Sequence, residues 1–121
     1  MTAETTEQDI DIGPAEAADK IAAGAQLVDV RQDFEWEAGR IPGAEHIPLE
    51  RLPAAAERFD PERPIVFQCR TGARSAMATQ VFRASGFEAY NLGGGLEAWV
   101  DEGREIEPDG GNVAVPRPDA S

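Results

Sequence analysis

One heptapeptide, Cys-Arg-Thr-Gly-Ala-Arg-Ser at residues 69–75, brings together residue types suited to nucleophilic chemistry and contains the only cysteine of the chain. The apolar run at 64–68 before it is typical of a buried strand, and 76–83 after it is typical of a helix. Loop N–H groups and the positive end of that helix would then point at the thiol. Arg70 and Arg74 add positive charge, so the setting favours the thiolate, the attacking form of cysteine. A buried bystander cysteine seldom has two arginines and a glycine so close in sequence.

The spacing within this segment narrows the chemistry. From Cys69 to Arg74 the pattern is C-x4-R, whereas cysteine-based phosphatases carry C-x5-R, whose N–H groups fit a tetrahedral phosphate. The loop is therefore one residue too short for that signature. A smaller ring of donors suits a single extra sulfur atom on Cys69 better than a bound phosphoryl group.

The pattern C-R-x-G-x-R-S after a strand resembles the active-site loop of the rhodanese (sulfurtransferase) family. Two other segments resemble the N-terminal and C-terminal signatures of the family, and they occur in the expected order around the loop. They are 27–49, which contains Leu-Val-Asp-Val-Arg and Gly-Arg-Ile-Pro-Gly-Ala, and 93–99, Gly-Gly-Gly-Leu-Glu-Ala-Trp. Arg40 stands where the family frequently has histidine, a position that we expect to be structural.

This resemblance implies an α/β fold of three layers, α/β/α, around a central parallel five-stranded sheet. Cys69 is then the catalytic residue, and its loop binds substrate and persulfide. The strand that ends at Asp29 lies beside the strand that ends at Cys69. Asp29 and Arg31 are therefore expected near the loop, where they buttress it and do not act on substrate. The loop residues are Arg70, Thr71, Gly72, Ala73, Arg74 and Ser75.

The periodicity of the chain agrees with alternating strands and helices, which favour a parallel sheet covered on both faces. Ligands of such sheets bind beyond the carboxyl ends of the strands, where Cys69 and Asp29 are expected. Pro53 is expected to shorten or kink one of the helices. Strands are predicted at 9–12, 26–30, 44–47, 64–68 and 88–92, and helices at 15–23, 33–38, 49–59, 76–83 and 95–102.

The length of 121 residues suits one domain. We divide it into a polar N-terminal segment, 1–7, a rhodanese-like domain, 8–103, and a tail, 104–121. Three prolines and two glycines in the tail, with few apolar residues, predict a segment that is poorly ordered or laid over the surface. A single cysteine excludes an internal disulfide and a multi-cysteine zinc site, and with His46 as the one histidine we expect no metal and no cofactor.

The formal net charge is −12, so this acidic protein is expected to repel nucleic acid and anionic membranes. The N-terminus lacks the basic start and apolar stretch of a secretion signal, and no apolar run approaches the roughly 20 residues that cross a bilayer. We therefore expect a cytoplasmic protein.

The mechanism that follows uses the thiolate alone, because the loop contains no histidine or carboxylate to act as a paired base. Cys69 attacks the outer sulfur of thiosulfate or a persulfide donor and becomes a persulfide. A nucleophilic acceptor, such as cyanide, a thiol or a protein, then removes the sulfur. The kinetics are expected to be ping-pong, and both Arg70 and Arg74 are candidates to contact the substrate.

Two other functions are compatible with the same residues. The chain could be a persulfide sulfur carrier that acts only with protein partners. A phosphatase-like or arsenate-reducing enzyme on the same fold is disfavoured by the C-x4-R spacing and by the lack of a second cysteine for a thiol relay.

Overall fold

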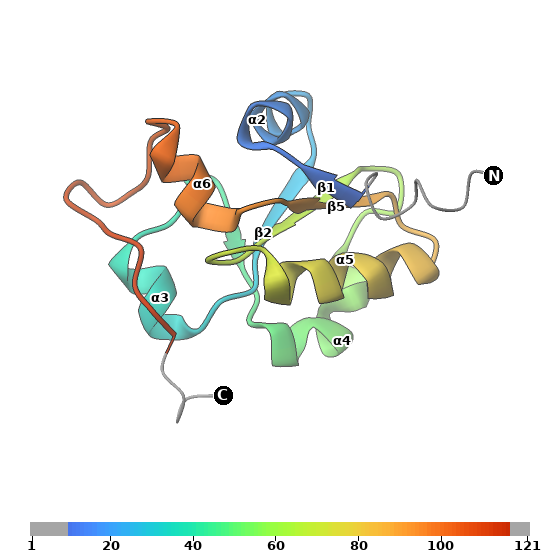
Figure 1. Cartoon of the computed structure of the whole chain (residues 1–121). Helices are drawn as coiled ribbons and strands as arrows, with labels where there is room; N and C mark the ends of the chain where they lie inside the picture. Colours follow the sequence, from blue (N-terminus) through green and yellow to red (C-terminus); the bar gives the residue numbers. More distant parts are fainter. Residues whose placement is uncertain (1–9, 117–121) are drawn as a thin grey trace.

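The computed structural model describes residues 10–116, so the expected polar segment 1–7 lies outside the described residues. Its centre is a five-stranded parallel sheet with the strand order β1-β5-β4-β2-β3 (Figure 1). This confirms the predicted sheet and places the strand of Asp29 directly beside the strand that leads to Cys69. The strands are β1 (Asp11–Ile12), β2 (Gln26–Asp29), β3 (Glu45–His46), β4 (Ile65–Gln68) and β5 (Ala89–Leu92).

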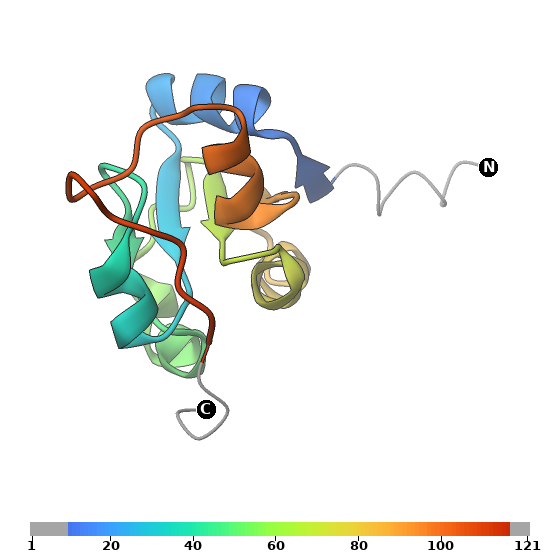
Figure 2. The same ribbon diagram turned by 60° about the vertical axis from the view of Figure 1, so that its left-hand side comes forward.

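Helices cover both faces of the sheet, as Figures 1 and 2 show. Alternate residues of β4 enter different cores: Ile65 and Phe67 pack toward α4 and α5, and Val66 packs toward α2 and α6. All residues of β4 are buried, which is why its sequence is almost wholly apolar. The helices are α2 (Pro14–Ala22), α3 (Asp33–Ala38), α4 (Leu52–Ala55), α5 (Ala73–Ala84) and α6 (Gly95–Asp101).

Two predicted helices differ from the structure. The predicted helix 49–59 is broken into two 3₁₀ turns, 49–51 and 56–58, on either side of α4, and Pro53 lies in the first turn of α4. Proline lacks an N–H group, so it can begin a new helical turn but cannot continue an existing one. Helix α5 begins at Ala73, three residues before the predicted start, because Gly72 adopts a left-handed conformation that ends the loop early.

The segment 104–116 lies over the surface of the domain beside α3 and α6 (Figure 2). Arg40 and Glu107 exchange two backbone hydrogen bonds, and the N–H of Asn112 donates to the carbonyl of Ala38. A Cβ atom on Gly39 would collide with the backbone of Asn112. We expected this segment to be either poorly ordered or laid over the surface, and its described part takes the second form. No helix within 10–116 is long and apolar enough to cross a membrane.

Candidate active site

Cys69 follows the last residue of β4, and its side chain is 1% exposed. The N–H of Gly72 donates to Cys69 Sγ over 3.1 Å, and Ser75 Oγ lies 3.3 Å from the same sulfur. The first N–H groups of α5 have no partner within the helix, so the positive end of the helix faces the loop. The structure thus brings the predicted cysteine, the turn of the loop and a helix N-terminus together around one sulfur atom.

The start of α6 holds the back of the loop through main-chain contacts. Leu96 N–H donates to the carbonyl of Cys69 over 2.8 Å, and Glu97 N–H donates to that of Arg70 over 3.1 Å. Gly95 has φ +61°, and a Cβ atom there would lie 2.5 Å from Cys69 O. The glycine triplet at 93–95 therefore forms a tight turn whose backbone packs against the loop.

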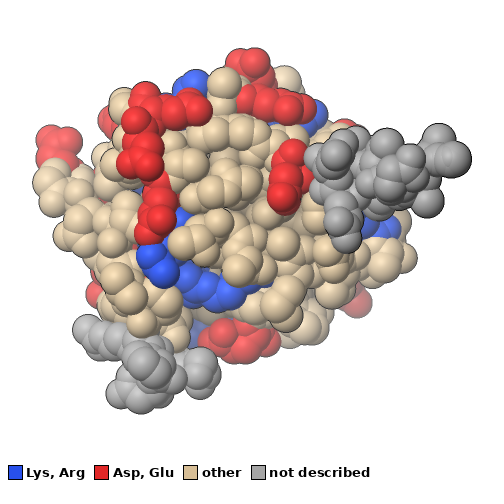
Figure 3. All heavy atoms as spheres, viewed as in Figure 1, with Lys and Arg blue, Asp and Glu red and all other residues tan. Residues whose placement is uncertain are grey.

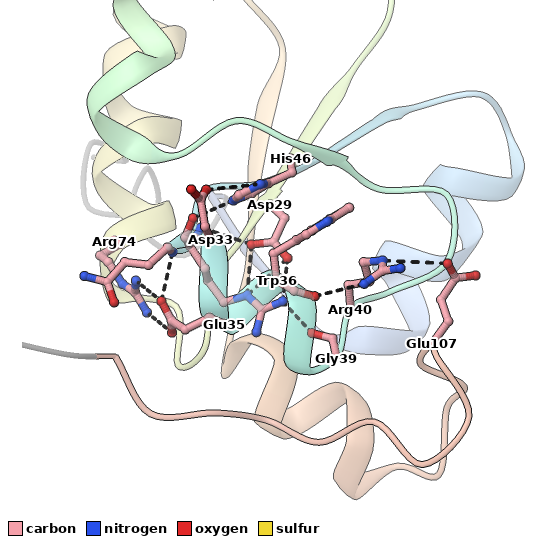
Figure 4. Close-up of polar contacts among 11 residues, drawn as sticks. Asp29, Asp33, Glu35, Trp36, Gly39, Arg40, His46, Arg74 and Glu107 are labelled. Atoms are coloured by element: carbon pink, nitrogen blue, oxygen red, sulfur yellow. Dashed lines mark hydrogen bonds and ion pairs between the residues drawn. The ribbon is translucent and has the colours of Figure 1, made fainter. Parts of the chain in front are cut away.

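Arg74 forms two parallel hydrogen bonds to Glu35 of α3, of 2.8 and 2.9 Å, and Figure 4 shows the two side chains facing each other. Glu35 is fully buried. Burial by itself raises the pKa of Glu35, but hydrogen bonds from Arg74 and from the backbone of Gln32 outweigh it, and the net pKa is lowered. The hydrogen bond to Glu35 raises the pKa of Arg74. Arg74 is thus a fixed cation that ties the start of α5 to α3.

Arg70, the other arginine of the loop, forms an ion pair with Glu97 of α6. Both loop arginines are therefore balanced by carboxylates from other helices. In the face drawn in Figure 3, Lys and Arg atoms likewise form a short band bordered by Asp and Glu. Glu35 and Glu97 lie inside the family segments 27–49 and 93–99, but no sequence pattern indicated that they pair with the loop arginines.

Asp29 and Arg31 lie at the end of β2 and are completely buried. Arg31 Nε donates to Asp29 Oδ1 over 2.9 Å, and Arg31 Nη2 donates to Asp29 Oδ2 over 2.7 Å. Arg31 Nη2 also donates to Gly39 O, at the end of α3, over 2.7 Å. Within residues 10–116, these hydrogen bonds join the two side chains to each other and to α3, which also carries the Glu35 partner of Arg74. That the pair buttresses the loop stays a prediction.

The remaining loop residues divide by exposure, and one contact was not anticipated. Thr71 and Ala73 are exposed, whereas Gly72 and Ser75 are buried. Asn91 of β5 lies 2.5 Å from Ser75 Oγ through its Oδ1 atom, and its Nδ2 donates to Gly72 O over 3.1 Å. Asn91 is 2% exposed. A buried amide in an otherwise apolar strand is the sequence signal that could have identified it.

A separate hollow of about 340 Å³ lies between α4 and α5. Its walls are mostly aliphatic and aromatic and contain no ionisable side chain. The lining residues include Leu49, Leu52, Pro53, Met77, Val81 and Phe87.

Comparison with known proteins gives the family. The model of the rhodanese-like domain matches residues 13–102. A protein of Allochromatium vinosum named sulfurtransferase is 36% identical over 86 residues, which cover 69% of this chain and 80% of the relative. The uncharacterised protein YqhL of Bacillus subtilis is 41% identical over 76 residues, or 62% of this chain and 60% of that protein.

This chain belongs to the rhodanese-like family. Among solved structures, a rhodanese-like domain protein of Staphylococcus aureus has a TM-score of 0.70 and 36% identity, covering 81% of this chain and 98% of the other. The family match excludes only the ends of the chain and spans both Cys69 and the Asp29–Arg31 pair. The resemblance inferred from three short motifs is thereby confirmed, and so is the rhodanese-like α/β fold.

Proposed function

We propose that this rhodanese-like domain is a sulfurtransferase that carries a sulfane sulfur as a persulfide on Cys69. The observation that carries the proposal is the position of Cys69 Sγ, at the base of a tight loop whose Gly72 N–H already donates to it. The sulfurtransferase name of a relative that this chain covers to 80% supports the same class of reaction. The donor is thiosulfate or a persulfide, and the acceptor is cyanide, a thiol or a protein.

In the first step, the Cys69 thiolate forms a bond to the outer sulfur of the donor. The sulfur–sulfur bond of the donor breaks, and its electron pair leaves with sulfite or a thiolate. The new terminal sulfur is anionic and lies among the N–H groups of residues 70–75, which stabilise it as an oxyanion hole stabilises a developing oxyanion. An acceptor nucleophile then takes this sulfur, and Cys69 leaves as the thiolate, which gives ping-pong kinetics.

The carboxylates near the loop do not act as general bases in this scheme. Glu35 and Glu97 each form an ion pair with a loop arginine, which keeps them ionised and holds them away from Sγ. Activation of Cys69 therefore relies on N–H donors and on the N-terminus of α5. Arg70 and Arg74 shape the loop and balance charge around the departing anion.

The test is the mass of the intact protein after brief exposure to thiosulfate, with Cys69→Ser as the control. The expected result is the gain of one sulfur atom that cyanide removes and that the serine variant does not show. A gain only with a persulfide donor would assign the donor to that class. No gain with either donor would contradict the proposal.

A further inference from the structure

Ser75 has one hydroxyl hydrogen and two neighbours that could accept it. Its Oγ lies 3.3 Å from Cys69 Sγ and 2.5 Å from Asn91 Oδ1. Ser75 is fully buried, so water does not supply an alternative partner. The direction of this one hydrogen determines whether Ser75 can stabilise a negative charge on Cys69.

The side-chain amide of Asn91 is held in one orientation. Its Nδ2 group donates to Asp11 Oδ1 over 2.9 Å and to Gly72 O over 3.1 Å. Both partners are acceptors, so turning the amide over would bring its oxygen against two other oxygens. The Oδ1 atom of Asn91 therefore faces Ser75 and can only accept a hydrogen bond.

The shorter contact consequently takes the hydrogen: Ser75 O–H donates to Asn91 Oδ1. The lone pairs of Ser75 Oγ then face Cys69 Sγ, where they can accept from a thiol S–H but repel a thiolate. We propose that Asn91 is a positioning residue that turns the Ser75 hydroxyl away from Cys69 and thereby favours the protonated thiol in the resting protein.

The consequence for catalysis rests on the proposed function, but the inference about the resting thiol does not. When Cys69 loses its proton to water, the hydroxyl hydrogen of Ser75 stays on Asn91 Oδ1, and the thiolate is stabilised by the N–H groups of the loop. No bond other than S–H breaks in this step. Oxidation of cysteine follows its thiolate character, so a resting thiol is also less easily oxidised.

The charged groups that surround Cys69 come from every neighbouring element, and none of them is substituted in the variants tested below. They are the Arg74–Glu35 and Arg70–Glu97 ion pairs, the buried Asp29–Arg31 pair and Asp11. Asn91→Leu also removes the hydrogen bond to Asp11, and the same substitution in the Ser75→Ala background measures that effect by itself.

The test is the pH dependence of Cys69 alkylation by iodoacetamide, measured as the pH at which the rate reaches half its maximum. This readout needs no sulfur transfer, so it stands even if the proposed function fails. Asn91→Leu removes the acceptor and frees the Ser75 hydroxyl to donate to the thiolate. We expect its midpoint to fall by roughly 1 pH unit, and a midpoint that is unchanged or raised would overturn the inference.

Ser75→Ala provides a second, independent test of the proposal if Asn91→Leu does not fold. Because Ser75 accepts from the thiol in the resting protein, its loss should leave the midpoint unchanged or lower it. A rise would show that Ser75 already donates to the thiolate, and would overturn the proposal. In the Ser75→Ala background, Asn91→Leu should cause no further shift.

Thr79→Val is the matched control for a general loss of buried hydrogen bonding. Thr79 lies one helical turn after Ser75, and its hydroxyl donates to the carbonyl of Ser75 over 2.8 Å. This substitution removes a buried hydroxyl that also contacts Ser75, but it leaves the side-chain contacts among Asn91, Ser75 and Cys69 intact. Its midpoint should equal that of the unmodified protein, and a shift as large as that of Asn91→Leu would assign the effect to packing and overturn the proposal.

Discussion

The ends of β4 and β2 lie side by side in the sheet, with Gln68 in register with Asp29, yet they use their polar groups in opposite ways. After β2, Asp29 and Arg31 bind each other in full burial. After β4, Cys69 accepts a hydrogen bond from the N–H of Gly72 and lies beside the N-terminus of α5, whose first N–H groups have no partner within the helix. The two ends lie at the same edge of the sheet, and charge distinguishes them: Asp29 and Arg31 neutralise each other, whereas the Gly72 N–H and the N-terminus of α5 face a single sulfur atom. On the proposed function, the β4 end binds the anionic sulfur and the β2 end stabilises the fold, and this difference can be tested by substitution.

The largest expected effect separates chemistry from stability at the β4 end. Cys69→Ser should reduce sulfur transfer to background, because serine cannot form a persulfide. The side chain is buried and nearly unchanged in size, so the free energy of unfolding should change by less than about 2 kcal/mol. Turnover and urea unfolding of the same preparation would check both statements. Measurable sulfur transfer by the folded Cys69→Ser variant would contradict the assignment of the chemistry to the β4 end.

The converse is expected at the β2 end. Arg31→Ala leaves the buried Asp29 carboxylate without its charged partner and with only the backbone N–H of residue 31 as a donor, which should lower the free energy of unfolding by about 3–5 kcal/mol. Sulfur transfer per folded molecule should persist, because this pair contacts α3 and not Sγ. Denaturant titration would measure the free energy of unfolding. Activity divided by the concentration of reactive Cys69 would measure sulfur transfer per folded molecule.

A paired control tests whether the charge itself is needed. Replacing both members with apolar residues, Asp29→Leu together with Arg31→Met, removes the unpaired charge. The double variant should therefore be more stable than Arg31→Ala alone. A double variant that is as unstable as Arg31→Ala would show that shape, and not the buried charge, determines stability at this end.

The sheet and the position of Cys69 could be predicted because they depend on local pattern. Apolar runs of strand length, glycines at the turns and the C-R-x-G-x-R-S motif are all visible within a few consecutive residues. The start of α5 lies earlier than predicted. It depends on a left-handed backbone conformation at Gly72, which a glycine in the sequence permits but does not require.

The partners of the loop arginines could not be predicted in the same way. Glu35 is 39 residues from Arg74, and Glu97 is 27 residues from Arg70. An acidic chain offers many carboxylates, and only the packing of α3 and α6 selects these two. The position of the segment 104–116 was hidden for another reason. Backbone hydrogen bonds hold much of it, and nearly any sequence can form these.

An intermediate effect is expected where the two regions meet, at Glu35. The pKa of Glu35 is lowered below its ordinary value of 4.5, so the ionised carboxylate stabilises the fold above that pH. This contribution is lost as the pH falls through the lower pKa of the folded state. Glu35→Gln should cost about 2 kcal/mol at pH 7 and flatten the fall in stability below about pH 4.5. Chemical unfolding at a series of pH values measures both, and parallel curves for the two proteins would contradict the assignment.

The smallest expected effect concerns the segment 104–116, which lies over α3 near the β2 end. Gly39 has an extended backbone, φ 175°, that alanine also adopts, so Gly39→Ala introduces no strain of its own. Its Cβ would nevertheless collide with the backbone of Asn112 and displace the segment that lies there. We expect faster amide exchange at Asn112 and Glu107, a loss of about 1 kcal/mol for the broken hydrogen bonds, and unchanged alkylation of Cys69. Gly43→Ala is the control, because a Cβ there meets no neighbouring atom within 4 Å although its φ of +86° strains the backbone. If Gly39→Ala changed the reactivity of Cys69 and Gly43→Ala did not, the two strand ends would be coupled through the segment that covers one of them.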